Sequence, residues 1–187
     1  MTSNQTGRLI GAIFGLVFVV ASAGNLPTAV GVPLRVLAIG TFVGLFIALR
    51  RGRTPRAAAD RAAAPLFGRG YRLVVAAEVV VGLAGLVLIN PVLHATRASV
   101  AWIALVVGLH FFGLAVVWRM PSIRLLAAAM SACGGAGLVL AVCGASAAVI
   151  AAVAGIAPGV MLLGSVWWSV RADKARRPAG RLATPEG

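Results

Sequence analysis

Long apolar runs separated by short arginine-bearing connections dominate this chain. Each run carries almost no charge and has the length of about 15 to 20 residues needed to cross a hydrocarbon core of roughly 30 Å. The pattern predicts an all-α polytopic membrane protein with six transmembrane helices in one domain, residues 1–170, followed by a basic, disordered tail, residues 171–187. The helices are expected at about Leu9 to Ala23, Leu34 to Leu49, Leu73 to Ile89, Val100 to Trp118, Leu125 to Val142 and Ala147 to Trp168.

The two central runs, between Tyr71 and Trp118, differ from the others because each holds one ionisable residue inside its apolar stretch. The third run holds Glu78 and the fourth holds His110. A carboxylate at membrane depth costs several kcal/mol unless it is protonated, paired or reached by water, so it marks a candidate functional site. Gly82 and Gly85 fall on the same helical face as Glu78, which directs that face towards the bundle.

Three arrangements of Glu78 and His110 are open from the sequence. Glu78 and His110 lie about 9 Å and about 13 Å along their helices from the arginines at the helix ends. Because these heights are similar, direct contact between the two side chains is the first arrangement. Against it, side chains lean towards the N-terminus of their own helix, and these two helices run in opposite directions. The alternatives are a Glu78 side chain reaching the basic loop and a neutral His110 bonded to a backbone carbonyl or a serine.

The charges predict how the helices are oriented. The chain has 17 basic residues against four acidic ones, a net charge of +13. The basic residues stand between and after the apolar runs, where they orient helices and meet anionic lipid head groups, and this position argues against nucleic acid as the partner. The segments on one side of the predicted membrane carry fifteen of these basic residues, and the segments on the other side carry two. Both termini and the loop from Arg50 to Arg72 are therefore expected in the cytoplasm.

The start of the chain has a second interpretation. Arg8, the apolar run from Leu9 to Val20 and the small residues Ala21 to Ala23 also fit a signal peptide with its cleavage site. Cleavage would leave five helices and satisfy the charge pattern equally well. A weak internal repeat favours a first helix that is kept.

The repeat places Ala84-Gly-Leu-Val-Leu88 and Ala136-Gly-Leu-Val-Leu140 at the same distance after Arg72 and Arg124. It predicts three helical hairpins related by an axis along the membrane normal, although five-residue matches also arise by chance in so apolar a chain.

Small residues spaced by four mark the faces on which membrane helices pack closely, within the chain, in a homo-oligomer or against another membrane partner. Such pairs occur in the first, second and sixth runs, and we expect the glycines beside Glu78 to serve in the same way. Pro158 is expected to kink the sixth helix near Ala154. The packing candidates are Gly11 and Gly15, Gly40 and Gly44, Gly82 and Gly85, and Gly155 and Gly159.

Catalytic and cofactor motifs are not recognisable in the sequence. With two histidines, one of them, His94, in a predicted outer loop, neither a metal centre nor a haem is supported, and no cofactor is expected. Cys133 and Cys143 are about 15 Å apart along one predicted helix, which is beyond disulfide reach.

Phrases such as Tyr71-Arg-Leu-Val-Val-Ala-Ala-Glu78, Trp102-Ile-Ala-Leu-Val-Val-Gly-Leu-His110 and Ala157-Pro-Gly-Val-Met-Leu-Leu163 give the chain a resemblance to a family. It resembles small six-helix integral membrane proteins of high-GC actinobacteria. The resemblance implies a bacterial inner-membrane location and implies no activity. Two functions remain: a non-enzymatic scaffold or accessory subunit, which we favour, and a small-solute or proton-linked transporter that uses Glu78 and His110.

Overall fold

Helices make up the whole of the secondary structure in the part of the chain that the computed structural model describes, residues 3–51, 69–92, 94–117 and 121–176. The predicted all-helical class is confirmed. The long helices are α1 Ser3–Ser22, α2 Thr28–Arg51, α3 Arg69–Val87, α4 Ser99–Val117, α5 Pro121–Val142 and α7 Ala157–Arg176. A short helix α6, Ala147–Ala151, and a π-helical segment, Ala152–Ile156, lead into α7, and a second π-helical segment, Leu88–Val92, continues α3.

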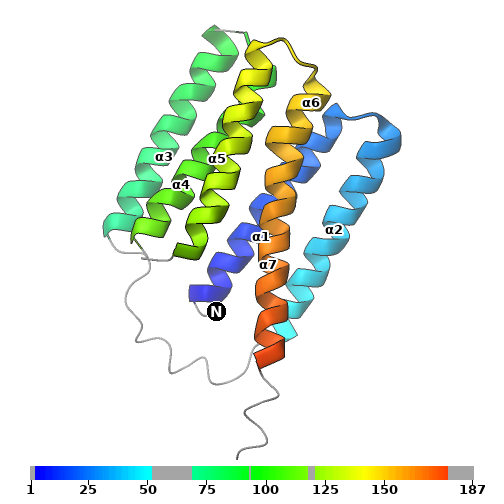
Figure 1. Ribbon diagram of the computed structural model, residues 1–187, viewed down its shortest axis with the longest axis vertical. Helices are drawn as coiled ribbons and strands as arrows, with labels where there is room; N and C mark the ends of the chain where they lie inside the picture. The colour runs from blue at the N-terminus through cyan, green and yellow to red at the C-terminus, as the bar shows by residue number, and fades with distance from the viewer. Residues whose placement is uncertain (1–2, 52–68, 93, 118–120, 177–187) are drawn as a thin grey trace, which may run out of the picture.

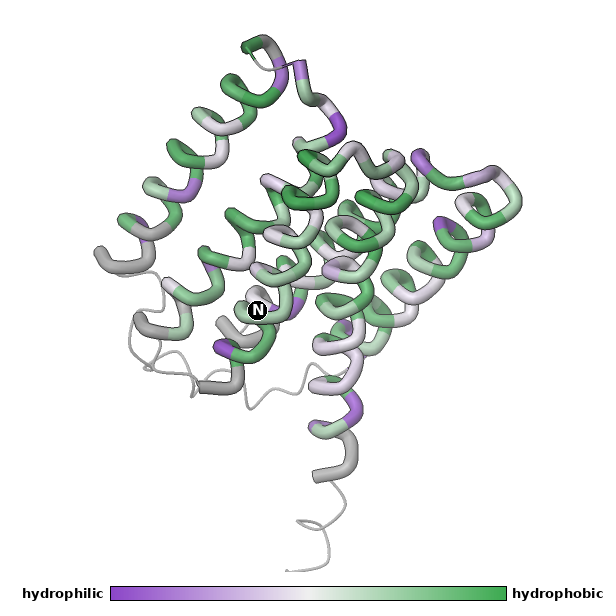
Figure 2. The backbone as a smooth tube through the Cα atoms, turned by 45° about the horizontal axis from the view of Figure 1, so that its top comes forward, coloured by the Kyte–Doolittle hydropathy of each residue, from purple (hydrophilic) through white to green (hydrophobic). Residues whose placement is uncertain are grey.

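Most of these helices have the length and hydropathy of membrane spans. Five apolar stretches qualify within the described residues, and the stretch Val75–Asn90, in α3 and the π-helical segment that continues it, is apolar but shorter. Figure 2 shows hydrophobic residues along the middle of the helices and most hydrophilic ones near their ends and turns. The fold is therefore that of a helical membrane protein.

The helices form a bundle with α3 at one edge and α2 at the other (Figure 1). The most extensive interface joins α4 to α5, and α1 packs against both α7 and α2. One buried cluster lies between α1, α2 and α7 and includes Ala12, Leu45 and Val166. A second, around Met130 and Leu162, joins α1 and α7 to α4 and α5.

Glycine permits a close approach between helices α1 and α7. A Cβ atom at Gly15 would stand 2.9 Å from the carbonyl oxygen of Gly159, and one at Gly159 would stand 2.8 Å from the carbonyl oxygen of Gly15. Gly11 also faces α7, where its Cβ would make an ordinary contact with Val166 at 3.5 Å. Backbone meets backbone here because neither helix carries a side chain at the crossing.

The first helix contributes to the core, and its small terminal residues have a packing explanation. Ser22 is 1% exposed and lies against Gly155. Any side chain at Gly155 would overlap the hydroxyl group of Ser22. A Cβ at Gly31 would stand 2.5 Å from the carbonyl oxygen of Ala23. These two contacts give Ser22 and Ala23 a packing role in the folded chain.

The second helix is longer than the sequence predicts and packs with a different face. It begins at Thr28, directly after Pro27, and includes Pro33, whereas we expected it from Leu34. Its 24 residues span about 36 Å, enough to cross a bilayer. Gly44 faces Trp167 at 3.8 Å, but a Cβ at Gly40 would meet nothing within 4 Å. The expected packing role of Gly40 is therefore wrong within this chain, because α2 turns Ala38 and Leu45 towards α1 and α7 instead.

The last helix contains the irregularity expected near Pro158 and extends further than predicted. The π-helical segment Ala152–Ile156 ends two residues before Pro158, whose missing N–H leaves one carbonyl of the preceding turn without its usual partner. Helix α7 then continues to Arg176, six residues into the segment expected to be disordered. Arg171 stacks on Trp167 and Asp173 pairs with Arg8, and both contacts stabilise these additional turns.

Two alanine substitutions in α7 test the role of glycine at the helix crossing. Gly159→Ala should lower the stability of the purified protein by about 1–3 kcal/mol, because the new methyl group would stand 2.7 Å from Val19 and 2.8 Å from the backbone of α1. Gly164→Ala is the matched control, since a Cβ there meets nothing within 4 Å, and it should not destabilise the protein. Thermal unfolding in one detergent measures both, and equal stability of the two variants would contradict the packing assignment.

Candidate functional site

Glu78 and His110, the two ionisable residues singled out from the sequence, lie next to each other between α3 and α4. His110 Nδ1 is 2.6 Å from Glu78 Oε2, and their side chains are 15% and 21% exposed. The ring nitrogen does not meet the angular requirement of a hydrogen bond, and the contact is an ion pair when the imidazole is protonated. Of the three arrangements open from the sequence, the structure contains the direct pair.

Glycines beside Glu78 and a tryptophan on α4 set the register that brings the pair together. Any side chain at Gly85 would overlap the indole ring of Trp102, and a Cβ at Gly82 would be 3.8 Å from Val106. The indole N–H of Trp102 also donates a hydrogen bond of 3.2 Å to the carbonyl oxygen of Gly82. Because α3 and α4 approach closely here, Glu78 and His110 meet although their side chains lean in opposite directions along the bundle.

A polar contact at the far end of the same interface was not foreseen from the sequence. Ser99 donates its hydroxyl hydrogen to Asn90 Oδ1 at 2.9 Å, and Asn90 Nδ2 donates to the carbonyl oxygen of Leu86 at 3.0 Å. Asn90 and Ser99 flank the turn between the two helices, so the only sequence signal was their position near the ends of apolar runs. Trp102 of α4 packs into the glycine face of α3, a contact that the sequence did not indicate either.

The interface is important because α3 has little other support. Its extensive contacts are with α4 and with the π-helical segment that continues it. Among the α3 side chains that the structure describes, none is fully buried, and Leu73, Val80 and Leu83 are each more than half exposed. The attachment of α3 to the bundle therefore depends on the contacts that Glu78, Gly82, Gly85 and Asn90 make with α4.

A second ion pair joins the start of α1 to the end of α7. This pair was not foreseen from the sequence. Arg8 Nη1 is 2.5 Å from Asp173 Oδ2, which places these two helix ends side by side. His94 is exposed in the turn before α4, with a φ of 52° in the left-handed region. Within the described ranges, no three His, Cys, Asp or Glu side chains are grouped closely enough to hold a metal ion.

Comparisons of the chain with family models, curated proteins and solved structures found no match. A carboxylate and an imidazole this close can pass a proton between two helices once the ring turns to align with the carboxylate, and they can also hold the helices together as a fixed ion pair. Both uses need the two side chains to face each other, as they do.

A double-mutant cycle measures the strength of the Glu78–His110 contact. Glu78→Ala and His110→Ala should each destabilise the protein, and the double variant should lose about 1 kcal/mol less than the sum, as expected for a polar contact between membrane helices. Leu109 supplies the control because it neighbours His110 in the sequence and is 54% exposed. A cycle of Glu78→Ala with Leu109→Ala should show coupling near zero. Coupling of equal size in both cycles would contradict a specific contact.

Proposed function

We propose that the protein crosses the bacterial inner membrane six times as three helical hairpins, with α1 retained and both termini in the cytoplasm. The fifteen-to-two distribution of basic residues supports this orientation. The ion pair of Arg8 with Asp173 supports it as well, because it joins the first and last helices at one end of the bundle. The long α3, extended by its π-helical segment, supplies the sixth crossing.

Cysteine accessibility tests this topology in intact cells. In a chain whose Cys133 and Cys143 are replaced by alanine, single cysteines introduced at Thr28 or His94 should react with a membrane-impermeant maleimide. A cysteine at position 54, which lies outside the described residues, should react only after the cells are broken. The reverse pattern would contradict the proposed orientation, and labelling of all three positions in intact cells would contradict the six-helix topology.

For the function itself, we propose a non-enzymatic scaffold or accessory subunit. The observation that carries this proposal is that Glu78 and Asn90, the polar side chains within or beside the apolar stretch of α3, have partners on α4. A polar group that is already paired inside a helix interface serves assembly, since its desolvation is compensated there and binding a solute would require breaking that contact. The exposed apolar face of α3 is available to membrane partners.

A proton-linked transporter is the second candidate, and the same pair favours it. Ionisable side chains at membrane depth are rare and form the proton relays of pumps and carriers. Glu78 lies on α3 and His110 lies on α4, and α3 is held to the bundle almost entirely by α4. Separation of α3 from α4 would therefore expose both groups at once.

Glu78→Gln distinguishes the two functions because it removes the charge while keeping the size and polarity of the side chain. Purified protein is placed in vesicles that contain a pH-sensitive dye, and an imposed potential drives proton movement. A scaffold should show no flux above protein-free vesicles, with or without Glu78→Gln. A flux in the wild type that Glu78→Gln abolishes, while thermal unfolding shows the variant to be folded, would overturn the scaffold proposal in favour of a carrier.

A further inference from the structure

The contacts of α3, the helix at one edge of the bundle (Figure 1), are concentrated towards the turn that leads into α4. At the turn, Ser99 donates its hydroxyl hydrogen to the side chain of Asn90 at 2.9 Å. The backbone N–H of Ala95 donates to the carbonyl oxygen of Ile89 at 2.9 Å, and Ile89 is only 8% exposed. Hydrogen bonds and a buried side chain therefore anchor this end of the helix.

The opposite end of α3 is held less firmly. Leu73, Ala76 and Ala77, which precede Glu78 in the helix, are all exposed. Among the side chains of α3 that the structure describes, Glu78 makes the polar contact with α4 that lies furthest from the turn. The end of α3 that begins at Arg69 is therefore joined to α4 through the contact of Glu78 with His110, with nothing equivalent beyond it in the described side chains.

A departure from α-helical geometry separates the anchored turn from the rest of α3. The π-helical segment Leu88–Val92 follows directly after Val87, the last residue of α3, and it contains Pro91. Proline has no N–H, so one carbonyl of the preceding turn lacks its usual partner, and prolines and π-turns are the common sites at which helices bend. Hinges are formed by a few residues at the end of an element, as here.

The distances along α3 make a small rotation at this segment selective. At 1.5 Å per residue, Gly85 lies about 5 Å from Leu88 and Glu78 lies about 15 Å from it. A rotation of about 10° away from α4 would move Gly85 by less than ~1 Å and Glu78 by about 3 Å. The indole ring of Trp102 would stay against Gly85, whereas the 2.6 Å separation of Glu78 from His110 would roughly double.

We infer that α3 is a hinged arm that swings about Leu88–Val92 and opens the Glu78–His110 site at one end of the bundle only. The opening end is the one that begins at Arg69, and the end at the turn stays closed. Water entering there would reach Glu78, which lies about 9 Å along the helix from Arg72. The assignment of this end to the cytoplasm rests on the proposed topology, whereas the motion itself rests on contacts within the chain.

Separation of α3 along its whole length is the alternative motion. It would leave the side chains of Asn90 and Ser99 without each other in lipid, where no water replaces a lost hydrogen bond. It would also expose Ile89 and withdraw the ring of Trp102 from the glycine face of α3. Rotation at the hinge keeps all of these contacts and breaks only that of Glu78 with His110, so it is the less costly movement.

Distances between pairs of spin labels, measured by double electron–electron resonance, test the hinge in the purified full chain in detergent. The two native cysteines are replaced by alanine, and labels are attached to introduced cysteines. The free-end pair joins Leu73 on α3 to Leu125 on α5, and the hinge-end pair joins Val92 to Val142. All four positions are at least 59% exposed. Helix α5 serves as the reference because its interface with α4 is the most extensive in the bundle.

We expect the free-end pair to give a broader distance distribution than the hinge-end pair, with a second population about 4 Å longer for each 10° of rotation. Glu78→Ala should raise the ratio of the longer to the shorter population about fivefold, as expected for the loss of a polar contact between membrane helices. The hinge-end distribution should not change. Leu109→Ala, at a 54% exposed position beside His110, is the matched control and should leave both distributions as in the wild type.

Two results would overturn the inference. Distributions of equal width that Glu78→Ala leaves unchanged would show that α3 is fixed along its length, and equal broadening of both pairs would show that the whole helix separates. If thermal unfolding shows that Glu78→Ala does not fold, His110→Ala removes the same contact from the α4 side. The distances are measured in detergent without a gradient, so an error in the proposed topology or function would leave them unchanged.

Discussion

Lipid imposes the constraint on which this structure depends. Hydrocarbon offers neither water to satisfy polar groups nor a hydrophobic driving force to press one apolar helix against another. Helices must then be held by close contact and by the few polar groups that find partners between them. The crossing of α1 and α7 uses the first device, where Gly15 and Gly159 bring two backbones together. The α3–α4 interface adds the second, with Glu78 against His110.

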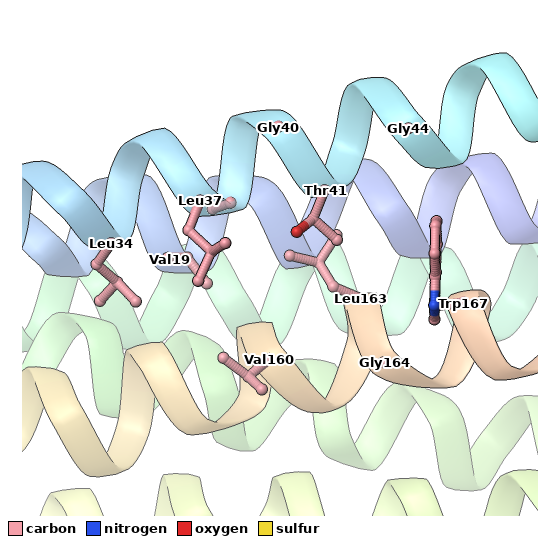
Figure 3. Close-up of a pocket in the computed structure, with 11 residues that line it drawn as sticks. Val19, Leu34, Leu37, Gly40, Thr41, Gly44, Val160, Leu163, Gly164 and Trp167 are labelled. Atoms are coloured by element: carbon pink, nitrogen blue, oxygen red, sulfur yellow. The ribbon is translucent and has the colours of Figure 1, made fainter.

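The two edges of the bundle are consequently different surfaces. Helix α3 is attached along one narrow face, where its glycines receive an indole ring of α4 and its polar side chains have partners. The remaining faces of α3 are apolar and exposed. Helix α2 is attached through a buried cluster around Leu45, and beside that cluster an open apolar groove runs between α2 and α7 (Figure 3).

The helices could be predicted from the sequence because membrane crossing fixes length and hydropathy together. Glu78 and His110 could be singled out because charge is costly in lipid. Their contact could not be predicted, because it depends on the register of α3 against α4, which Trp102 and Gly85 set through a contact distant in sequence. Spacing by four residues likewise could not show that Gly40 faces outward, since the direction of a helix face follows from its neighbours and not from its own residues.

The π-helical segment Ala152–Ile156 changes the direction in which the side chains of the following helix, α7, point. A wider turn accommodates a surplus residue, and each residue of an α-helix advances the side-chain direction by about 100°. Without that surplus, everything beyond Pro158 would be rotated, and Gly159 would no longer face α1. Insertions and deletions in this short stretch are thus constrained far more tightly than its plain alanine-rich composition suggests, whereas exchanges among small residues at its exposed position, Ala152, are not.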